Sequence, residues 1–408
     1  MKKLFGLSGI ITIAAIIGFS IAACNSNKSL GNGDGNGDGN DYVFDFDFKY
    51  PPAPKGPSAP EPFNDITAAQ LVANIKVGWN LGNTLDTHNV TWHGPNPTVS
   101  QFETAWRNPV TTKTHITAIK NAGFNAIRIP VSWTKCADSK YNIRADWMER
   151  VTEVVNYAVD NDMYIVLNTH HDEDVFKFTN DKKAASINAF KKIWGQIACN
   201  FQNYNEKLIF EGLNEPRTIG SAAEWNGGTA SERANLNEHY KAFVETVRAC
   251  GGNNDKRFLV LNTYAASSDK AAMESLTIPA DTAQNKIIAS YHAYEPYHFA
   301  MNTGNGSVKT WSQSNSSDTS PITSRINQAK STFIDKGIPV IIGEFGALNK
   351  DNEPARAEWV EFYVKSALQR GIKCFWWDDG GDFKLYNRRG NTFFYPQIRD
   401  GLIRGAGN

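Results

Sequence analysis

Two glutamates in this chain follow short apolar runs of the kind that form buried strands. Glu215 ends the stretch KLIFEGLNE (207–215), and Glu344 lies near the end of IPVIIGEFG (338–346). Burying a carboxylate costs free energy unless the group is paired, and Pro216 prevents the first run from continuing as a strand. A carboxylate held at the end of a core strand is therefore a candidate for chemistry.

Paired carboxylates suit the cleavage of a glycosidic bond. One holds a proton near neutral pH and gives it to the leaving oxygen, while the other stays ionised and attacks the anomeric carbon. Carboxyl groups roughly 5–5.5 Å apart leave no room for a water molecule, so a covalent intermediate forms and configuration is retained. Repulsion between the two raises the pKa of one, and a nearby arginine lowers the pKa of the other. Arg128 is the candidate arginine.

Other polar and aromatic residues also stand at the ends of apolar runs. They are Arg128, His170, His171, Asp172, Asn214, His292, Tyr294, Trp376, Trp377 and Asp378. In a parallel barrel the carboxyl ends of all strands converge on one face, so we expect these residues to be neighbours. His170 and His171 suggest a metal, since histidine is a common ligand. However, adjacent residues on a strand point to opposite faces, so we predict no metal site.

Eight strand-like runs alternate with amphipathic stretches. The runs are 75–82, 124–132, 163–171, 207–215, 257–264, 286–294, 338–346 and 371–379; the stretches include 111–123, 145–162, 184–201, 231–252 and 353–371. Eight βα units over about 345 residues predict an α/β fold, a single (β/α)₈ TIM barrel over residues 62–408. The alternative is a doubly wound sheet, which would more naturally carry a Gly-rich phosphate loop after its first strand, and GWNLGNT (78–84) is not one.

The first 23 residues are typical of a secretory signal, with Lys2 and Lys3 before an apolar run. The small residues before Cys24 resemble a bacterial lipoprotein signal, which implies cleavage before Cys24 and lipid attached to it. An ordinary secretory signal is the alternative. Asn25 favours export to the outer membrane over retention in the inner one, so we expect a lipid-anchored protein at the cell surface or in the periplasm.

A low-complexity segment follows this signal. Residues 24–61 contain the flexible run GNGDGNGDGN (31–40) and the stiff run PPAPKGPSAPEP (51–62), so we predict a tether before the globular domain. Between these runs, the stretch DYVFDFDF (41–48) alternates aromatic and acidic residues. It could add an edge strand or lie along the domain surface.

The charge balance and the four remaining cysteines indicate which kinds of partner and metal site to expect. Lys and Arg together number 42, as do Asp and Glu, so nothing favours nucleic acid and a neutral partner is expected. Cys136, Cys199, Cys250 and Cys374 show no zinc-binding spacing. Four cysteines allow three full pairings that sequence does not distinguish, and we expect buried thiols.

Eight stretches together identify a resemblance. They are GWNLGNTLD (78–86), ETAWRNP (103–109), GFNAIRIPVSW (123–133), VLNTHHD (166–172), FEGLNEPR (210–217), SYHAYEPY (290–297), IGEFGA (342–347) and FWWDDGG (375–381). With these in order, the chain from about residue 65 onward resembles glycoside hydrolase family 5, and most closely its fourth subfamily of endoglucanases. The resemblance implies a retaining endo-β-1,4-glucanase that cuts internal bonds of cellulose, xyloglucan or mixed-linkage glucan without a cofactor.

The resemblance also implies roles for individual residues. Glu215 is expected to be the acid/base and Glu344 the nucleophile, while Asn214 is expected to bind the 2-hydroxyl of the sugar. The other expected substrate-site residues are Asn83, Trp106, Arg128, His170, His171, His292, Tyr294, Trp376 and Trp377. Either Trp376 or Trp377 would form the floor under the reacting sugar, and the sequence leaves this register open. Asp379 departs from the usual Asn of the family, which puts an outlying subsite in doubt.

Several alternatives remain at this point. Mannan or xylan could be the substrate on the same scaffold, since pocket details decide. A non-catalytic surface glycan-binding lipoprotein is the alternative from another class, although such a binder needs neither Glu215 nor Glu344. We expect a monomer whose partner is a β-glucan, with no contact to nucleic acid and none to the membrane except through Cys24.

Overall fold

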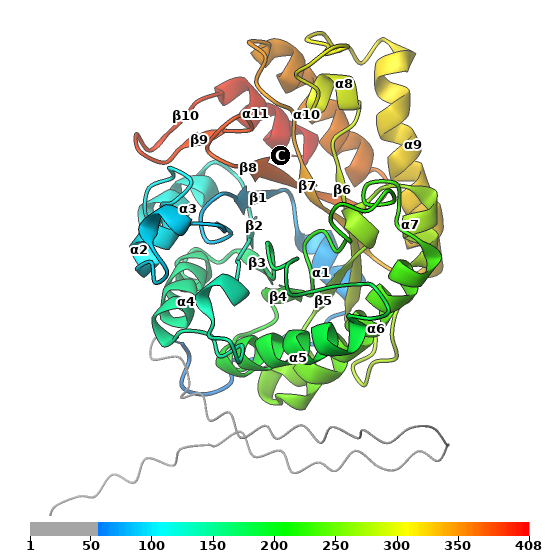
Figure 1. Ribbon diagram of the computed structural model, residues 1–408. Helices are drawn as coiled ribbons and strands as arrows, with labels where there is room; N and C mark the ends of the chain where they lie inside the picture. Colours follow the sequence, from blue (N-terminus) through cyan, green and yellow to red (C-terminus); the bar gives the residue numbers. More distant parts are fainter. Residues whose placement is uncertain (1–55, 408) are drawn as a thin grey trace, which may run out of the picture. The chain divides into compact units, whose positions relative to one another are not determined.

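A computed structural model of the protein describes residues 56–407, and its centre is a closed barrel of eight parallel strands. The strands are β1 (Gly78–Leu81), β2 (Ala126–Ile129), β3 (Tyr164–Asn168), β4 (Leu208–Glu211), β5 (Leu259–Asn262), β6 (Ile287–Ala293), β7 (Val340–Phe345) and β8 (Lys373–Asp378). Each pairs with the next in sequence, and β8 pairs with β1 to close the ring (Figure 1). The predicted (β/α)₈ class is confirmed, with strands shorter than the apolar runs.

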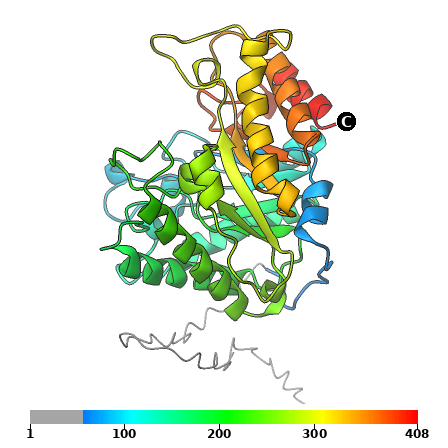
Figure 2. The same ribbon diagram turned by 90° about the vertical axis from the view of Figure 1, so that its right-hand side faces the viewer.

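Helices surround this barrel. They are α1 (Ala68–Asn74), α2 (Val99–Glu103), α3 (Lys113–Asn121), α4 (Ala145–Val159), α5 (Lys183–Asn200), α6 (Ala230–Ala249), α7 (Lys270–Ser275), α8 (Tyr297–Ala300), α9 (Ser316–Thr332), α10 (Glu353–Leu368) and α11 (Pro396–Gly405). A short antiparallel pair, β9 (Tyr386–Asn387) and β10 (Thr392–Phe393), follows β8. Figure 2 shows α9, α10 and α11 side by side on the flank of the barrel.

Both faces of the strands are covered, which explains their almost continuous apolar sequence. One apolar cluster fills the inside of the barrel with a residue from most strands, including Ala126, Ile209 and Phe375. A larger cluster lies between the strands and the surrounding helices. It contains Trp147 of α4 and Trp359 of α10, both fully buried. Because side chains alternate along a strand, residues two positions apart share a face.

A segment before α1 covers the amino-terminal end of the barrel. The Glu61 amide donates to the Asn203 carbonyl at 2.8 Å, and the Phe63 ring stacks on Phe258 with 6.1 Å between centroids. Asp65 forms an ion pair with Lys286 at 2.7 Å. Glu61 belongs to the segment predicted as a tether, so in the structure its last residues contact the barrel. The boundary at residue 62 stays a prediction.

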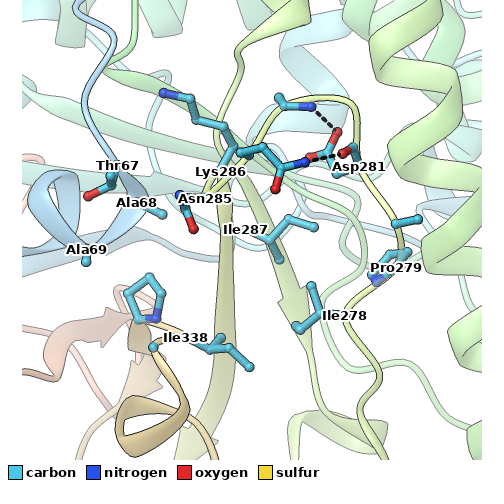
Figure 3. Close-up of a pocket in the computed structure, with 15 residues that line it drawn as sticks. Thr67, Ala68, Ala69, Ile278, Pro279, Asp281, Asn285, Lys286, Ile287 and Ile338 are labelled. Atoms are coloured by element: carbon cyan, nitrogen blue, oxygen red, sulfur yellow. Dashed lines mark hydrogen bonds between the residues drawn. The ribbon is translucent and has the colours of Figure 1, made fainter.

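A pocket opens at this same amino-terminal end. Figure 3 shows Thr67 and Ala68 from the start of α1, with Ile287 of β6 and Ile338, which precedes β7, across from them. Its lining contains neither Glu215 nor Glu344. The candidate chemistry of this chain therefore lies at the other end of the strands.

Some sequence predictions fall outside the described residues. The signal peptide 1–23, the lipidation site Cys24 and the stretch 41–48 precede residue 56. Within residues 56–407, no helix combines the length and apolar character that crossing a bilayer requires.

Gly78 gives a test of packing inside the barrel. A Cβ at this position would lie 2.0 Å from Cδ1 of the buried Phe375 ring on the neighbouring strand. We expect Gly78→Ala to lower the free energy of unfolding by about 1–3 kcal/mol, as overpacking does, measured by urea denaturation. Gly304→Ala is the control, since its nearest neighbour would be an Asn302 oxygen at 3.6 Å. Equal stabilities of the two variants would contradict the packing described.

Candidate active site

A polar layer lies directly above the apolar filling of the barrel. Asn80, Arg128, Asn168, Glu211 and Asn262 come from β1 to β5, and all five are fully buried. Arg128 stands two residues after Ala126, and Glu211 two residues after Ile209, both of which are members of the inner apolar cluster. Strand alternation therefore turns the layer inward, and this layer forms the base of the site.

Arg128 is the centre of that layer. Its Nε and Nη2 donate to the two carboxylate oxygens of Glu211 at 2.8 and 2.7 Å, and its Nη1 donates to Glu344 Oε1 at 2.7 Å. Nη2 also reaches Asn214 Oδ1 at 2.6 Å, and Nη1 reaches Asn80 Oδ1 at 3.0 Å. Burial lowers the pKa of Arg128, but Glu211 and Glu344 raise it by more, so the guanidinium stays charged.

Glu211 is a functional residue that the sequence analysis missed. Besides Arg128, it accepts a hydrogen bond from Asn262 Nδ2 at 2.7 Å and a weaker one from Asn168 Nδ2 at 3.4 Å. Its bidentate pairing fixes the plane of the guanidinium, which leaves Nη1 of Arg128 aimed at Glu344. The sequence did contain a signal for Glu211, because a glutamate in the apolar run LIFE (208–211) needs a buried partner.

Glu344 is held by donors on both of its oxygens. Arg128 contacts Oε1, while the Tyr294 hydroxyl donates to Oε2 at 2.9 Å and His292 Nδ1 lies 3.5 Å from the same oxygen. Burial and the negative charge of Glu344 raise the pKa of Tyr294 well above its usual value, so the hydroxyl keeps its proton. The register between β6 and β7 shifts between Tyr291 and His292. Such irregularities re-aim side chains at functional sites.

Glu215 faces Glu344 across His292. His292 Nδ1 lies 2.9 Å from Glu215 Oε1, and ligand atoms of Glu215, His292 and Glu344 all lie within 4.8 Å of one another. Burial raises the pKa of Glu215, but the hydrogen bond from His292 and the positive charges of His292, Arg217 and His171 outweigh it, so the net shift is downward. The spacing is that of a carboxylate pair with no room for a water between its members.

Arg217 links Glu215 to two further carboxylates, and the sequence analysis assigned it no role. Its Nη1 donates to the Glu215 carbonyl at 2.9 Å and lies 3.6 Å from Glu215 Oε2. The same nitrogen contacts Glu173 at 3.1 Å, and Nε contacts Glu224 at 3.1 Å. Its guanidinium also lies 4.6 Å from the ring centre of Trp225, an exposed residue. These residues come from loops, where no periodic pattern marks them.

Glu173 connects this group to His171. His171 Nδ1 lies 3.4 Å from Glu173 Oε1, the same oxygen that Arg217 contacts. Burial raises the pKa of Glu173, but its bond to His171 and the charges of His171 and Arg217 bring it down to about 2. Burial lowers the pKa of His171, but Glu173 raises it by more. The positive charge of His171 therefore contributes to the field around Glu215.

His170 and His171 lie beyond the end of β3 at Asn168, so strand alternation does not separate them as we expected. Their ring centres are 4.4 Å apart, and with Asp86 they offer ligand atoms within 4.8 Å of one another. Burial lowers the pKa of His170 far below its usual value, so this ring is neutral. Its Nδ1 lies 3.2 Å from Asn168 Nδ2.

The structure separates the two tryptophans of β8. Trp377 is partly exposed and stacks parallel to His170, with 5.7 Å between ring centres. Trp376 is fully buried, and its Nε1 donates to the Phe383 carbonyl. The expectation that Trp376 binds substrate is therefore wrong, because strand alternation turns it outward against α10. Trp377, two residues after the inward Phe375, turns toward the inside of the barrel, which makes it the candidate floor of the site.

Two other expected residues lie close to this floor. Trp106 is partly exposed and packs edge-on against His171, with ring centres 5.8 Å apart. Asn83 has a positive φ of 54°, and its amide donates to Asp86 Oδ2 at 3.0 Å. Asp379 accepts backbone hydrogen bonds from Gly381 and Phe383. Its carboxylate therefore caps a turn in the loop after β8.

Known proteins resemble this chain in both sequence and fold. The sequence model of the cellulase family, glycosyl hydrolase family 5, matches residues 87–382. Endoglucanase A of Clostridium longisporum is 43% identical over 349 residues, which is 84% of this chain. A solved GH5-4 broad specificity endoglucanase from Ruminococcus champanellensis, with bound cellotriose, is 44% identical with a TM-score of 0.81, covering 84% of this chain and 100% of that one.

The chain spans only part of some relatives. It matches 66% of the length of the Clostridium longisporum enzyme and 41% of the cellulase/esterase CelE of Acetivibrio thermocellus, to which it is 42% identical over 85% of its own length. Residues 87–382, which the family model matches, include Glu215, Glu344 and Arg128, which holds Glu344. The chain belongs to glycosyl hydrolase family 5, the cellulase family.

Proposed function

We propose that this chain is a retaining endo-β-1,4-glucanase that hydrolyses internal bonds of β-glucans by double displacement. The observation that carries the proposal is the placement of Glu215 and Glu344 beside His292. One carboxylate oxygen of each glutamate and one ring nitrogen of His292 all lie within 4.8 Å of one another. Arg128 and Tyr294 hold the second carboxylate in place. Family membership and the endoglucanase relatives support the same activity.

In the first step Glu344 attacks the anomeric carbon while Glu215 protonates the leaving oxygen. The hydrogen bond between Glu215 and His292 places a proton on this pair next to that oxygen. A bound sugar chain displaces water and disfavours the ionised carboxylate, which raises the pKa of Glu215 toward the value an acid needs. In the second step Glu215 accepts a proton from the water that breaks the glycosyl ester on Glu344.

Asn214 and Trp377 are the substrate contacts nearest these carboxylates. Arg128 holds the Asn214 side-chain oxygen at 2.6 Å, so the amide nitrogen is free to turn toward a sugar 2-hydroxyl. The Trp377 ring offers an apolar face to the C–H groups of a pyranose. Trp106, which packs against His171, and the exposed Trp225, which lies against Arg217, add further aromatic faces. His170 and His171 line the same floor.

A β-glucan is the substrate that these features support best. The chain carries no net charge, and the site combines aromatic faces with hydrogen-bonding groups, which suits a neutral sugar polymer. The Ruminococcus champanellensis relative is described as a broad specificity endoglucanase and holds cellotriose. Mannan and xylan are the runner-up substrates, and faster hydrolysis of either than of β-glucan would reassign the substrate. A purely glycan-binding role leaves the Arg128-held Glu344 unexplained.

Substitution of either carboxylate tests the reaction. We expect Glu215→Gln and Glu344→Gln each to lower the release of reducing ends from carboxymethylcellulose by roughly 10³-fold, because the first removes the group that transfers a proton in both steps and the second removes the nucleophile. Binding of cello-oligosaccharides, measured by calorimetry, should persist. Glu238→Gln on the exposed face of α6 is the control and should keep full activity.

The stereochemistry of the wild-type product belongs to the same test. Proton NMR of the first product should show the β-anomer, which then mutarotates. An α-anomer as the first product would remove Glu344 from the role of nucleophile. If Glu215→Gln hydrolysed the substrate at the wild-type rate, Glu215 would not be the acid.

Arg217 sets a testable pH dependence. Its positive charge, with His292 and His171, lowers the pKa of Glu215, while Glu344 faces the same carboxylate. Arg217→Gln removes that charge, leaves Glu224 without its cationic partner and leaves Glu173 with His171 alone, so both effects raise the pKa of Glu215. Because the acid must be protonated to act, the basic limb of kcat/KM should move to higher pH by about one unit.

The control for this variant is Arg144→Gln. Arg144 precedes α4, pairs with Asp146 in the first turn of that helix and makes none of these contacts. Its pH profile should match the wild type. A basic limb that stays in place or moves to lower pH in Arg217→Gln would show that Arg217 does not act on Glu215.

We further propose that the protein is exported, carries lipid on Cys24 and acts as a monomer on the outer membrane. The support for export, lipidation and the outer membrane is the sequence around Cys24, including Asn25 after it. The monomer stays a prediction. Cells that produce the full chain should incorporate labelled palmitate into it, and Cys24→Ala should abolish the incorporation. Label that persists in Cys24→Ala would contradict this anchor.

A further inference from the structure

Two cysteines from neighbouring helices meet at the amino-terminal end of the barrel. Cys199 lies in the last turn of α5, and Cys250 follows the last residue of α6. The Cys199 thiol donates to the Cys250 sulfur, with 3.1 Å between the two atoms. Cys250 also donates to the Gly195 carbonyl of α5 at 3.5 Å, which directs its side chain toward that helix.

The surroundings hold the two cysteines in this position. The Asn253 amide donates to the Gln202 carbonyl at 2.8 Å, and Asn254 Nδ2 donates to the Ala198 carbonyl at 2.8 Å. Arg257 Nη2 donates to the Phe201 carbonyl at 3.2 Å and to the Tyr204 carbonyl at 2.7 Å. The segment after α6 is therefore bonded to the segment after α5, so the two sulfurs face each other across a fixed junction.

We propose that Cys199 and Cys250 form a disulfide when the protein meets a disulfide donor. A sulfur–sulfur bond is about 2.05 Å long, so closing it requires an approach of only about 1 Å. A rotation of the Cys199 side chain, which is partly exposed in the last turn of α5, is enough for such a movement. Neither sulfur has a role in the proposed hydrolysis, so this inference stands independently of it.

The reaction is thiol–disulfide exchange with a donor such as oxidised glutathione. Cys199 is partly exposed, so its thiolate attacks one sulfur of the donor and releases one molecule of reduced thiol. The Cys250 thiolate then attacks the Cys199 sulfur of this mixed disulfide and releases the second thiol. Cys199 and Cys250 together lose two electrons and two protons, and the donor is reduced by the same amount.

Cys136 and Cys374 provide an internal contrast. Cys136 lies after β2 and Cys374 lies within β8, and both are buried thiols. Burial raises the pKa of the Cys136 thiol to about 12, and it raises that of Cys374 further. Neither side chain is placed to meet a donor, so oxidation should be confined to Cys199 and Cys250.

The crosslink would act on stability rather than on chemistry. It joins residues 51 positions apart, and the enclosed segment contains β4, Glu215 and α6. Closing a loop of this length restricts the unfolded chain. The bond lies at the ends of α5 and α6, beside the segment that covers the amino-terminal end of the barrel, whereas the carboxylates lie at the other end.

Peptide mapping tests the bond directly. The full-length protein is incubated with oxidised glutathione, alkylated and digested with trypsin without reductant. We expect a linked pair of the peptides 193–207 and 249–256, which reductant separates. A digest in which both cysteines are alkylated, or in which either is linked to Cys136 or Cys374, would overturn the proposal.

Thermal unfolding tests its consequence. Reductant should lower the Tm of the oxidised protein by on the order of 5 °C, while kcat/KM stays unchanged. The Cys199→Ser variant should show no reductant effect, whereas the matched control Cys136→Ser should keep it in full. A reductant effect that survives in Cys199→Ser would assign it to another group and contradict the crosslink.

Discussion

The active end of this barrel depends on one buried guanidinium between two carboxylates. Arg128 donates to Glu211 from two of its nitrogens and to Glu344 from one. All three side chains are almost completely removed from water. Removing such charges from water costs several kcal/mol for each ion unless every donor finds a partner. Asn80, Asn168, Asn214 and Asn262 supply the remaining partners. The arrangement therefore persists only while this layer is complete, so the position of Glu344 on β7 depends on polar residues of β1 to β5.

The periodicity of the strands produces this layer. In β2 to β5, an inward position carries an apolar residue, and the inward position two residues later carries Asn, Arg or Glu. A closed ring makes these positions converge, since the strands tilt around a common axis. The same alternation separates Trp377, which lies in the site, from Trp376, which packs against α10. A shift of one residue in β8 would exchange the two rings.

Loops complete the electrostatics that the strands begin. Arg217 and Glu173 lie outside the strands, and together they place a positive charge beside Glu215 and anchor His171.

The sequence analysis also did not predict helix α9, since it is rich in Ser and Thr and contains Pro321. Its burial rests on Ile322, Ile326 and Ala329, which share one face of the helix. Short polar segments of this kind carry weak periodic signals, so their structure depends on contacts with the rest of the barrel.

The sequence alone determined the eight strand-and-helix units, the barrel that they form, and the positions of Glu215 and Glu344 at strand ends. These follow from local apolar patterns and from the cost of burying a carboxylate. Only the tertiary structure decided that Glu211 shares Arg128 with Glu344, that Trp377 turns inward while Trp376 packs against α10, that the two histidines lie ring against ring, and that Cys199 reaches Cys250. Each of these depends on the register between strands or on the packing of one helix against another. These distances are fixed only when the barrel closes, so no local pattern of residue types predicts them.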